Sequence, residues 1–124
     1  MYLIDSDVLI DFLKAKKNAI KVLGKLKPNE RCTSIICVGE ILEGLAEKQK
    51  GKFQKLTDLI SVYDVNLKVM VKFSEIRKEL RKKGNLIDNF DILIAATCVV
   101  YGLTLITNNL KHFERVEGLK ILRK

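Results

Sequence analysis

Three apolar stretches of the chain hold eight carboxylates and no lysine or arginine. The stretches are residues 1–13, 32–47 and 84–110, and their acids are Asp5, Asp7, Asp11, Glu40, Glu43, Glu47, Asp88 and Asp91. A buried charge of either sign is costly unless it is paired. Carboxylates that gather without a basic partner repel one another, and their pKa values rise unless a cation lies among them. A divalent cation meets this need, and ligands that are all oxygen favour Mg²⁺ or Mn²⁺ over zinc.

The rest of the chain carries every basic residue. The sequence has 23 Lys and Arg against 15 Asp and Glu, a formal net charge of +8. The bases form blocks within residues 14–27, 48–55 and 77–83. Such blocks favour contact with a phosphate backbone and predict binding that weakens strongly with salt; the alternative is a solvated surface that only aids solubility. With 6% aromatic residues and no Trp, we expect recognition through backbone and shape rather than on a base-stacking platform.

Length and composition restrict the class of protein. A chain of 124 residues that is 48% hydrophobic fits a single domain over residues 1–124 that folds without a disulfide or a metal. The odd number of cysteines in apolar segments fits reduced core thiols; these are Cys32, Cys37 and Cys98. His112 is the only histidine, and we expect it to pack or cap beside Phe113 without a chemical role. Neither a membrane span of roughly 20 residues nor a signal peptide is evident, so we expect a cytoplasmic protein that does not bind membranes.

Short apolar runs alternate with segments of helical periodicity. We expect strands at residues 2–4, 32–36, 61–65, 103–107 and 119–122. We expect helices from residue 6 or 7, with Ser6 or Asp7 as the N-cap, and at residues 14–27, 38–49, 53–60, 67–83, 88–101 and 110–113. The alternation predicts right-handed βαβ units. The fold class is therefore α/β: a three-layer α/β/α sandwich with a central, mostly parallel sheet of four to five strands.

Four oxygen-bearing side chains are expected to meet at one edge of this sheet. In open parallel sheets, ligands bind beyond the carboxyl ends of the strands. Asp5 follows the first strand, and Asn108 and Asn109 follow the fourth. Glu40 and Asp91 lie in the first turns of helices that follow connections from the same edge. The topology, rather than the composition, thus brings distant segments together.

The segments that carry these residues resemble the PIN-domain endoribonucleases, and specifically the VapC-type toxins of toxin–antitoxin pairs. The matching motifs are Tyr2-Leu3-Ile4-Asp5-Ser6-Asp7-Val8-Leu9-Ile10-Asp11, Ser34-Ile35-Ile36-Cys37-Val38-Gly39-Glu40-Ile41-Leu42-Glu43-Gly44, Asp91-Ile92-Leu93-Ile94-Ala95-Ala96-Thr97 and Gly102-Leu103-Thr104-Leu105-Ile106-Thr107-Asn108-Asn109. Each motif is weak by itself, but their order and spacing match across essentially the whole chain.

The resemblance implies a catalytic acidic triad of Asp5, Glu40 and Asp91, which would hold Mg²⁺ or Mn²⁺. Asn109 stands where many relatives have a fourth acid, so the number of bound ions stays open. Secondary candidates beside the triad are Asp7, Asn108 and Asp88. The implied activity is metal-dependent hydrolysis of RNA phosphodiester bonds. The resemblance further implies a homodimer and a cognate antitoxin whose tail occupies the catalytic groove. From the apolar side chains among the charges of residues 38–60, we expect this segment to form the partner-binding helix pair.

Other interpretations of the same residues stay open at this point. A receiver-like phosphoacceptor domain also places acids and Mg²⁺ at strand ends, with Asp64 and Lys120 as its candidate residues, but it leaves Glu40 and Asp91 unexplained. A non-catalytic RNA-binding protein that keeps the fold is a second alternative, and the intact triad argues against it. For Glu43 and Glu47, a solvated helix face is the favoured interpretation. A DNA substrate is not excluded.

Overall fold

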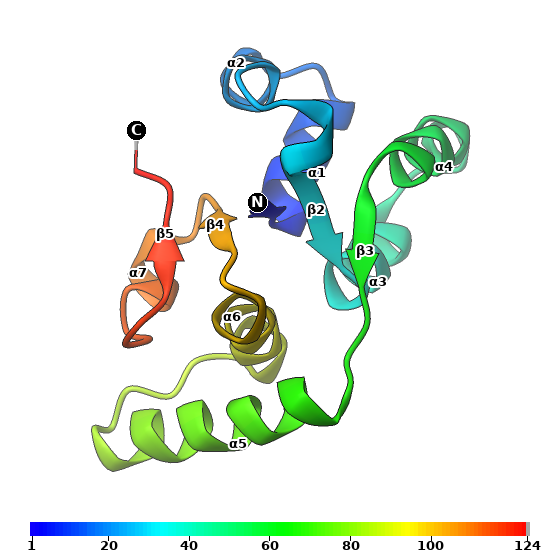
Figure 1. Cartoon of the computed structure of the whole chain (residues 1–124). Coiled ribbons are helices and arrows are strands. Elements are labelled where there is room, and N and C mark those ends of the chain that lie inside the picture. The colour runs from blue at the N-terminus through cyan, green and yellow to red at the C-terminus, as the bar shows by residue number, and fades with distance from the viewer. Residues whose placement is uncertain (124) are drawn as a thin grey trace.

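Five parallel strands form the central sheet, in the order β3-β2-β1-β4-β5 (Figure 1). The computed structural model describes residues 1–123. The strands are β1 (Tyr2–Ile4), β2 (Arg31–Ser34), β3 (Ser61–Tyr63), β4 (Thr104–Ile106) and β5 (Lys120–Ile121). The parallel sheet predicted from the sequence is confirmed, including its fifth strand, although every strand after the first is shorter than expected.

Helices cover both faces of the sheet. They are α1 (Ser6–Leu13), α2 (Lys17–Gly24), α3 (Ile35–Gly44), α4 (Lys50–Leu59), α5 (Leu67–Lys82), α6 (Asn89–Tyr101) and α7 (Leu110–Phe113), with short 3₁₀ turns at Pro28–Glu30 and Glu47–Gln49. Leu3 and Leu105 belong to one core with α5 and α6, whereas Ile4 and Ile106 belong to a second core with α1 and α2. Successive strand residues point to opposite faces, so each strand feeds both cores. The three-layer sandwich is confirmed. Within residues 1–123, no helix combines the length and the hydropathy of a membrane span.

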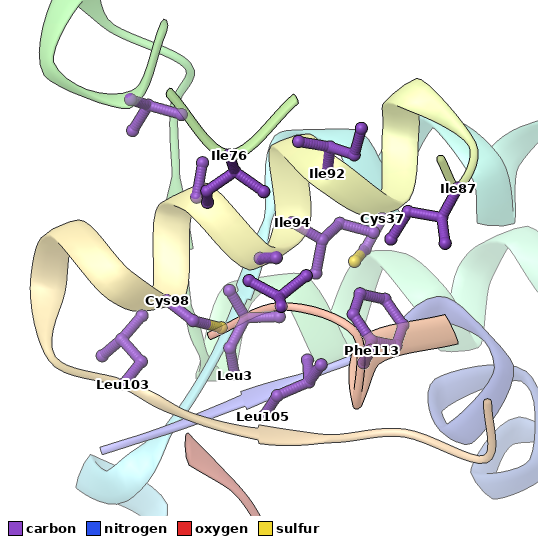
Figure 2. Close-up of a cluster of buried hydrophobic side chains, with 14 of the residues drawn as sticks. Leu3, Cys37, Ile76, Ile87, Ile92, Ile94, Cys98, Leu103, Leu105 and Phe113 are labelled. Carbon is purple, nitrogen blue, oxygen red and sulfur yellow. The ribbon is translucent and has the colours of Figure 1, made fainter. Parts of the chain in front are cut away.

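The helix α6 lies in the centre of the larger core. Figure 2 shows Ile94 and Cys98 of this helix facing Leu3 and Leu105 of the sheet. The helix ends where Gly102 takes a φ of 65°, a left-handed conformation that glycine adopts at little cost. All three cysteines are free and buried, as expected for core thiols. This rigid, apolar helix fixes the position of the residues in its first turn.

The first two helices differ from the sequence prediction. Residues 14–27 do not form one helix, because α1 continues to Leu13, Ala15 takes a φ of 57°, and α2 occupies only Lys17–Gly24. The N-cap of α1 is Asp5 rather than Ser6 or Asp7. Asp5, the predicted site residue at the end of β1, is therefore also the N-cap of α1.

The helix α3 also begins earlier than expected, at Ile35 instead of residue 38. The hydroxyl of Ser34 accepts a hydrogen bond from the backbone N–H of Cys37 at 3.1 Å, which caps the helix directly after β2. The helix ends at Gly44, and residues 47–49 form a 3₁₀ turn rather than its last turn.

Candidate functional site

The carboxyl ends of the strands bring the predicted residues to one edge of the sheet. Asp5 lies between β1 and α1, and its backbone N–H donates to the carbonyl of Ile106 in β4 at 2.9 Å. Thr107 to Asn109 follow β4, Glu40 lies in α3, and Asp91 lies in the first turn of α6. Four segments that are distant in the sequence therefore supply one site.

Asp5 is the most buried acid of the site, with 5% of its surface exposed. The Thr107 hydroxyl donates to its Oδ2 at 2.7 Å, and the backbone N–H of Ser6 donates to its Oδ1 at 2.8 Å. The thiol of Cys37 donates to the same Oδ1 at 3.7 Å. Burial raises the pKa of Asp5, and the hydrogen bond from Thr107 is the largest of the contacts that oppose this rise. Several donors thus hold the carboxylate in a fixed orientation.

Glu40 lies next to Asp5 and shares a donor with it. The Ser6 hydroxyl donates to Glu40 Oε1 at 3.1 Å. One ligand atom from each of Asp5, Cys37 and Glu40 lies within 4.8 Å of the other two. Burial raises the pKa of Glu40, and the negative charges of Asp5 and Asp91 raise it further. The geometry and the mutual repulsion are those of a group that can hold a cation.

Asp91 belongs to the same electrostatic cluster but lies outside the tight group. Its Oδ2 is 3.4 Å from Nδ1 of His112, and the amide Nδ2 of Asn109 is 2.9 Å from the same nitrogen. Since Nδ1 donates in one tautomer and accepts in the other, Asp91 and Asn109 compete for it. Burial raises the pKa of Asp91, and the hydrogen bond from His112 opposes that rise. Asn109, which was predicted to be a site residue, therefore contacts His112, and His112 in turn contacts Asp91.

Asp7 and Asn108 hold the loop after β4 against α1. The backbone N–H of Asn108 donates to Asp7 Oδ2 at 3.2 Å, and its side-chain amide donates to Asp11 Oδ2 at 3.0 Å. Burial, and then the negative charge of Asp5, raises the pKa of Asp7 to about 7. Asp7 Oδ1 is buried without a hydrogen-bond partner. These two residues fasten Thr107 in the position from which it contacts Asp5.

Asp88 stands at the exposed edge of the cluster. It is the N-cap residue of α6 by backbone position, but its side chain makes no capping hydrogen bond. Burial is the main cause that raises the pKa values of Glu40 and Asp91, and the charge of Asp88 adds to both. Its contribution is therefore electrostatic.

Among residues 1–123, no lysine or arginine forms an ion pair with Asp5, Glu40 or Asp91. Other acids of the base-free stretches do pair, since Asp11 and Glu47 lie 3.4 and 2.8 Å from lysine ammonium groups. The site thus concentrates negative charge that no lysine or arginine in the described part of the chain balances. The orphaned oxygen of Asp7 and the oxygen-rich donor set fit a divalent metal ion.

The sheet order rules out the receiver-like alternative. Asp64 follows β3 and Lys120 lies in β5, which are the two opposite edges of the sheet. These residues cannot form one phosphoacceptor site. The favoured interpretation of Glu43 and Glu47 agrees with the structure, in which both are exposed.

Four residues of the site escaped the sequence prediction: Ser6, Cys37, Thr107 and His112. Ser6 and Thr107 are direct neighbours of predicted residues, which is the one local signal that marks them. His112 was expected to pack or cap without a chemical role, but its ring contacts Asp91 and Asn109. Cys37 was predicted to be a core thiol, and it also borders the cation-binding group.

Fold and site together define a class of protein. A parallel five-stranded sheet with a carboxylate cluster beyond β1 is the arrangement expected of a PIN domain, and the family model described as PIN domain matches residues 2–119. The chain belongs to the PIN domain family.

Within this family, the chain is similar to VapC proteins. It is 36% identical over 125 residues to Ribonuclease VapC1 of Methanocaldococcus jannaschii, covering 98% of this chain and 87% of that protein. It is 29% identical over 126 residues to the tRNA(fMet)-specific endonuclease VapC of Salmonella typhimurium, covering 97% and 95%. The VapC-type group predicted from the motifs is confirmed.

Solved structures show the same fold. The structure of DNA-bound VapBC from Salmonella typhimurium superposes with a TM-score of 0.89 at 28% identity, covering 98% of this chain and 96% of that chain. VapBC2 from Rickettsia felis, bound to a DNA fragment from its promoter, superposes with a TM-score of 0.88 at 27% identity and the same coverage.

Proposed function

We propose that the chain is an Mg²⁺- or Mn²⁺-dependent endoribonuclease that hydrolyses RNA phosphodiester bonds, and that it is the toxin of a type II toxin–antitoxin pair. The observation that carries this proposal is the cluster of carboxylates at the strand ends, which has no lysine or arginine partner among the described residues. The ribonuclease relatives support RNA as the substrate.

Asp5, Glu40 and Asp91 are the proposed metal ligands and catalytic residues. When bound, the ion supplies an activated water and neutralises charge on the phosphate. Thr107 and Ser6 orient the carboxylates of Asp5 and Glu40 through the hydrogen bonds at 2.7 and 3.1 Å. These contacts fix the ligand oxygens before any ion arrives, which reduces the reorganisation needed at the reacting phosphate.

Asn109 is the fourth proposed catalytic residue, and Asp7, Asn108 and Asp88 support the site. The amide of Asn109, in place of a fourth acid, removes one negative charge from the site. It leaves Asn109 able to orient His112 at 2.9 Å. Asp7 and Asn108 hold the loop after β4, and Asp88 contributes negative potential.

The proposed partners are RNA, a cognate antitoxin and a second copy of the chain. Similar structures are described as VapBC and as toxin–antitoxin complexes, which supports the antitoxin. Exposed apolar side chains near the start of α5 support a homodimer; they are Leu67, Met70 and Val71. We further propose that residues 1–124 form one nuclease domain that acts in the cytoplasm.

The decisive experiment incubates the purified protein with total cellular RNA, with millimolar Mg²⁺ or Mn²⁺ and with EDTA. Wild type is expected to cleave only with metal, and Asp5→Asn and Asp91→Asn are expected to be inactive. Asp58→Asn removes an exposed acid of α4 and is the matched control, which retains activity. Equal cleavage by wild type and both site variants would refute the site assignment. A single-stranded DNA of the same length tests the nucleic acid preference.

A further inference from the structure

A cavity of about 470 Å³ lies between α2 and residues 122–123, which follow β5. Its apolar side includes Tyr2, Leu26 and Leu122, and its charged side includes Lys21, Lys25 and Arg123. No active-site carboxylate lines it. An apolar wall next to several cations suits a ligand with a flat apolar part and an anionic part.

A second hollow of about 210 Å³ adjoins this cavity. The two hollows share Asn18, Val22 and Leu122 as lining residues. The second hollow extends to Thr107 and Asn108, which contact Asp5 and Asp7 directly. The two hollows therefore adjoin along α2, and the second ends at the loop that holds Thr107 against Asp5.

The charges along this path favour an anion. Within residues 1–123, neither Lys21 nor Lys25 forms an ion pair, whereas Arg123 pairs with Glu114 at 2.9 Å. The carboxylate that lines the second hollow is Asp11, which is neutralised by Lys16 at 3.4 Å. The positive potential of the larger cavity is therefore available to a ligand.

Both walls of the cavity are held by hydrogen bonds. The guanidinium Nη2 of Arg31 donates to the carbonyls of Leu23 and Leu26 at 3.1 and 2.7 Å, which fastens the end of α2. The backbone N–H of Leu122 donates to the carbonyl of Leu105 at 2.8 Å, which fastens the opposite wall to β4. The cavity is thus a preformed feature of the fold.

We propose that this cavity binds one nucleotide of the RNA substrate away from the cleaved phosphodiester, with the base against Tyr2 and the backbone phosphates at Lys21 and Lys25. Tyr2 begins β1 and Asp5 follows its last residue, so their backbones lie about 10 Å apart at roughly 3.3 Å per residue and their side chains point to opposite faces of the sheet. A single aromatic ring provides one base contact, which is compatible with a chain that is poor in aromatic residues. The inference rests on the proposed ribonuclease function.

The test measures binding of a fluorescein-labelled single-stranded oligoribonucleotide by anisotropy, in an Asp5→Asn background that does not cleave. The double variant Lys21→Glu/Lys25→Glu is compared with Lys68→Glu/Lys72→Glu. The control changes the net charge equally, on positions of α5 that lie across the sheet and outside the three basic blocks (Figure 1). We expect the cavity variant to weaken binding about tenfold and to lower the salt dependence, and the control to change affinity about twofold. Equal effects of both double variants would overturn the proposal.

A second comparison tests the base contact. Tyr2→Leu keeps an apolar side chain but removes the ring, and we expect about tenfold weaker binding. Tyr2→Phe keeps the ring and should bind as the parent protein does. Unchanged binding by Tyr2→Leu, with an unchanged melting temperature, would refute the base contact. If wild type cleaves RNA but these variants bind normally, only this inference fails. If wild type neither binds nor cleaves RNA, the proposed function itself fails.

Discussion

The variant Thr107→Val tests how much the hydrogen bond from Thr107 to the Asp5 carboxylate contributes to the free energy of unfolding. Thr107 is a buried residue with 8% of its surface exposed, and its hydroxyl donates to Asp5 Oδ2 at 2.7 Å. Removing a hydrogen bond to a charged group costs about 1.5–3 kcal/mol, against about 1 kcal/mol for a neutral pair. Valine keeps the shape, so we expect a loss of about 2 kcal/mol in the free energy of unfolding at pH 8.

Thr33→Val is the matched control for this prediction. Thr33 is also buried, with 0% of its surface exposed, and its hydroxyl donates to a neutral acceptor, the carbonyl of Ile4, at 2.8 Å. Its removal should cost about 1 kcal/mol. Urea unfolding in EDTA measures both variants at pH 8 and pH 4.

The pH dependence separates the two hydrogen bonds. Burial raises the folded-state pKa of Asp5 above its unfolded value, so ionisation of Asp5 reduces stability as the pH rises, and the Thr107 hydroxyl limits this reduction. Without the hydroxyl the reduction is larger, so the gap between Thr107→Val and wild type widens from pH 4 to pH 8. The Thr33→Val gap stays constant. Equal losses for both variants at pH 8, or a Thr107→Val gap that does not change with pH, would refute the reasoning.

Three further outcomes are expected. Millimolar Mn²⁺ should raise the melting temperature of wild type because it relieves carboxylate repulsion, and a similar rise in Asp5→Asn would contradict the site. Asp7→Asn should be more stable than wild type at pH 8 and equal near pH 4 in urea unfolding. The pKa of Asp7 is raised from 3.8 to about 7, so the cost of ionising it in the fold builds up between these two values and is complete above pH 7; lower stability at pH 8 would contradict this. His112→Ala should reduce cleavage about tenfold in a labelled-RNA assay through loss of the Asp91 contact, whereas His112→Asn should retain more activity; unchanged cleavage by His112→Ala would exclude the role.

The alternation of apolar and helical segments was sufficient to predict the parallel sheet and its strand-end site. Each element has a local cause that is readable in the chain. Tyr2-Leu3-Ile4 predicts a strand that ends at Asp5, and the apolar run that stops at Gly102 predicts the buried helix α6. Since parallel strands share one carboxyl edge, the positions of Asp5, Glu40 and Asp91 at that edge follow from local patterns and topology.

The boundaries were less predictable because single side chains decide them. The Ser34 hydroxyl starts α3 directly after β2, and the positive φ of Ala15 divides the predicted helix of residues 14–27. Neither feature changes the hydrophobic periodicity from which the helices were predicted. A capping side chain or a strained backbone residue shifts a helix boundary by only a few residues, which is too short a segment to alter the periodicity.

The sequence by itself placed Asp5, Glu40 and Asp91 in stretches without lysine or arginine, and hence indicated where a cation is needed. Only the tertiary structure decided which neutral groups orient them. Ser6, Thr107 and His112 contact their carboxylates across 34, 102 and 21 residues of chain. A hydroxyl or an imidazole has no periodic signature, and a hydrogen bond forms only when two segments are placed within about 3 Å. The cavity beside Tyr2 depends on the same condition, because its walls come from the start of β1, from α2 and from residues 122–123.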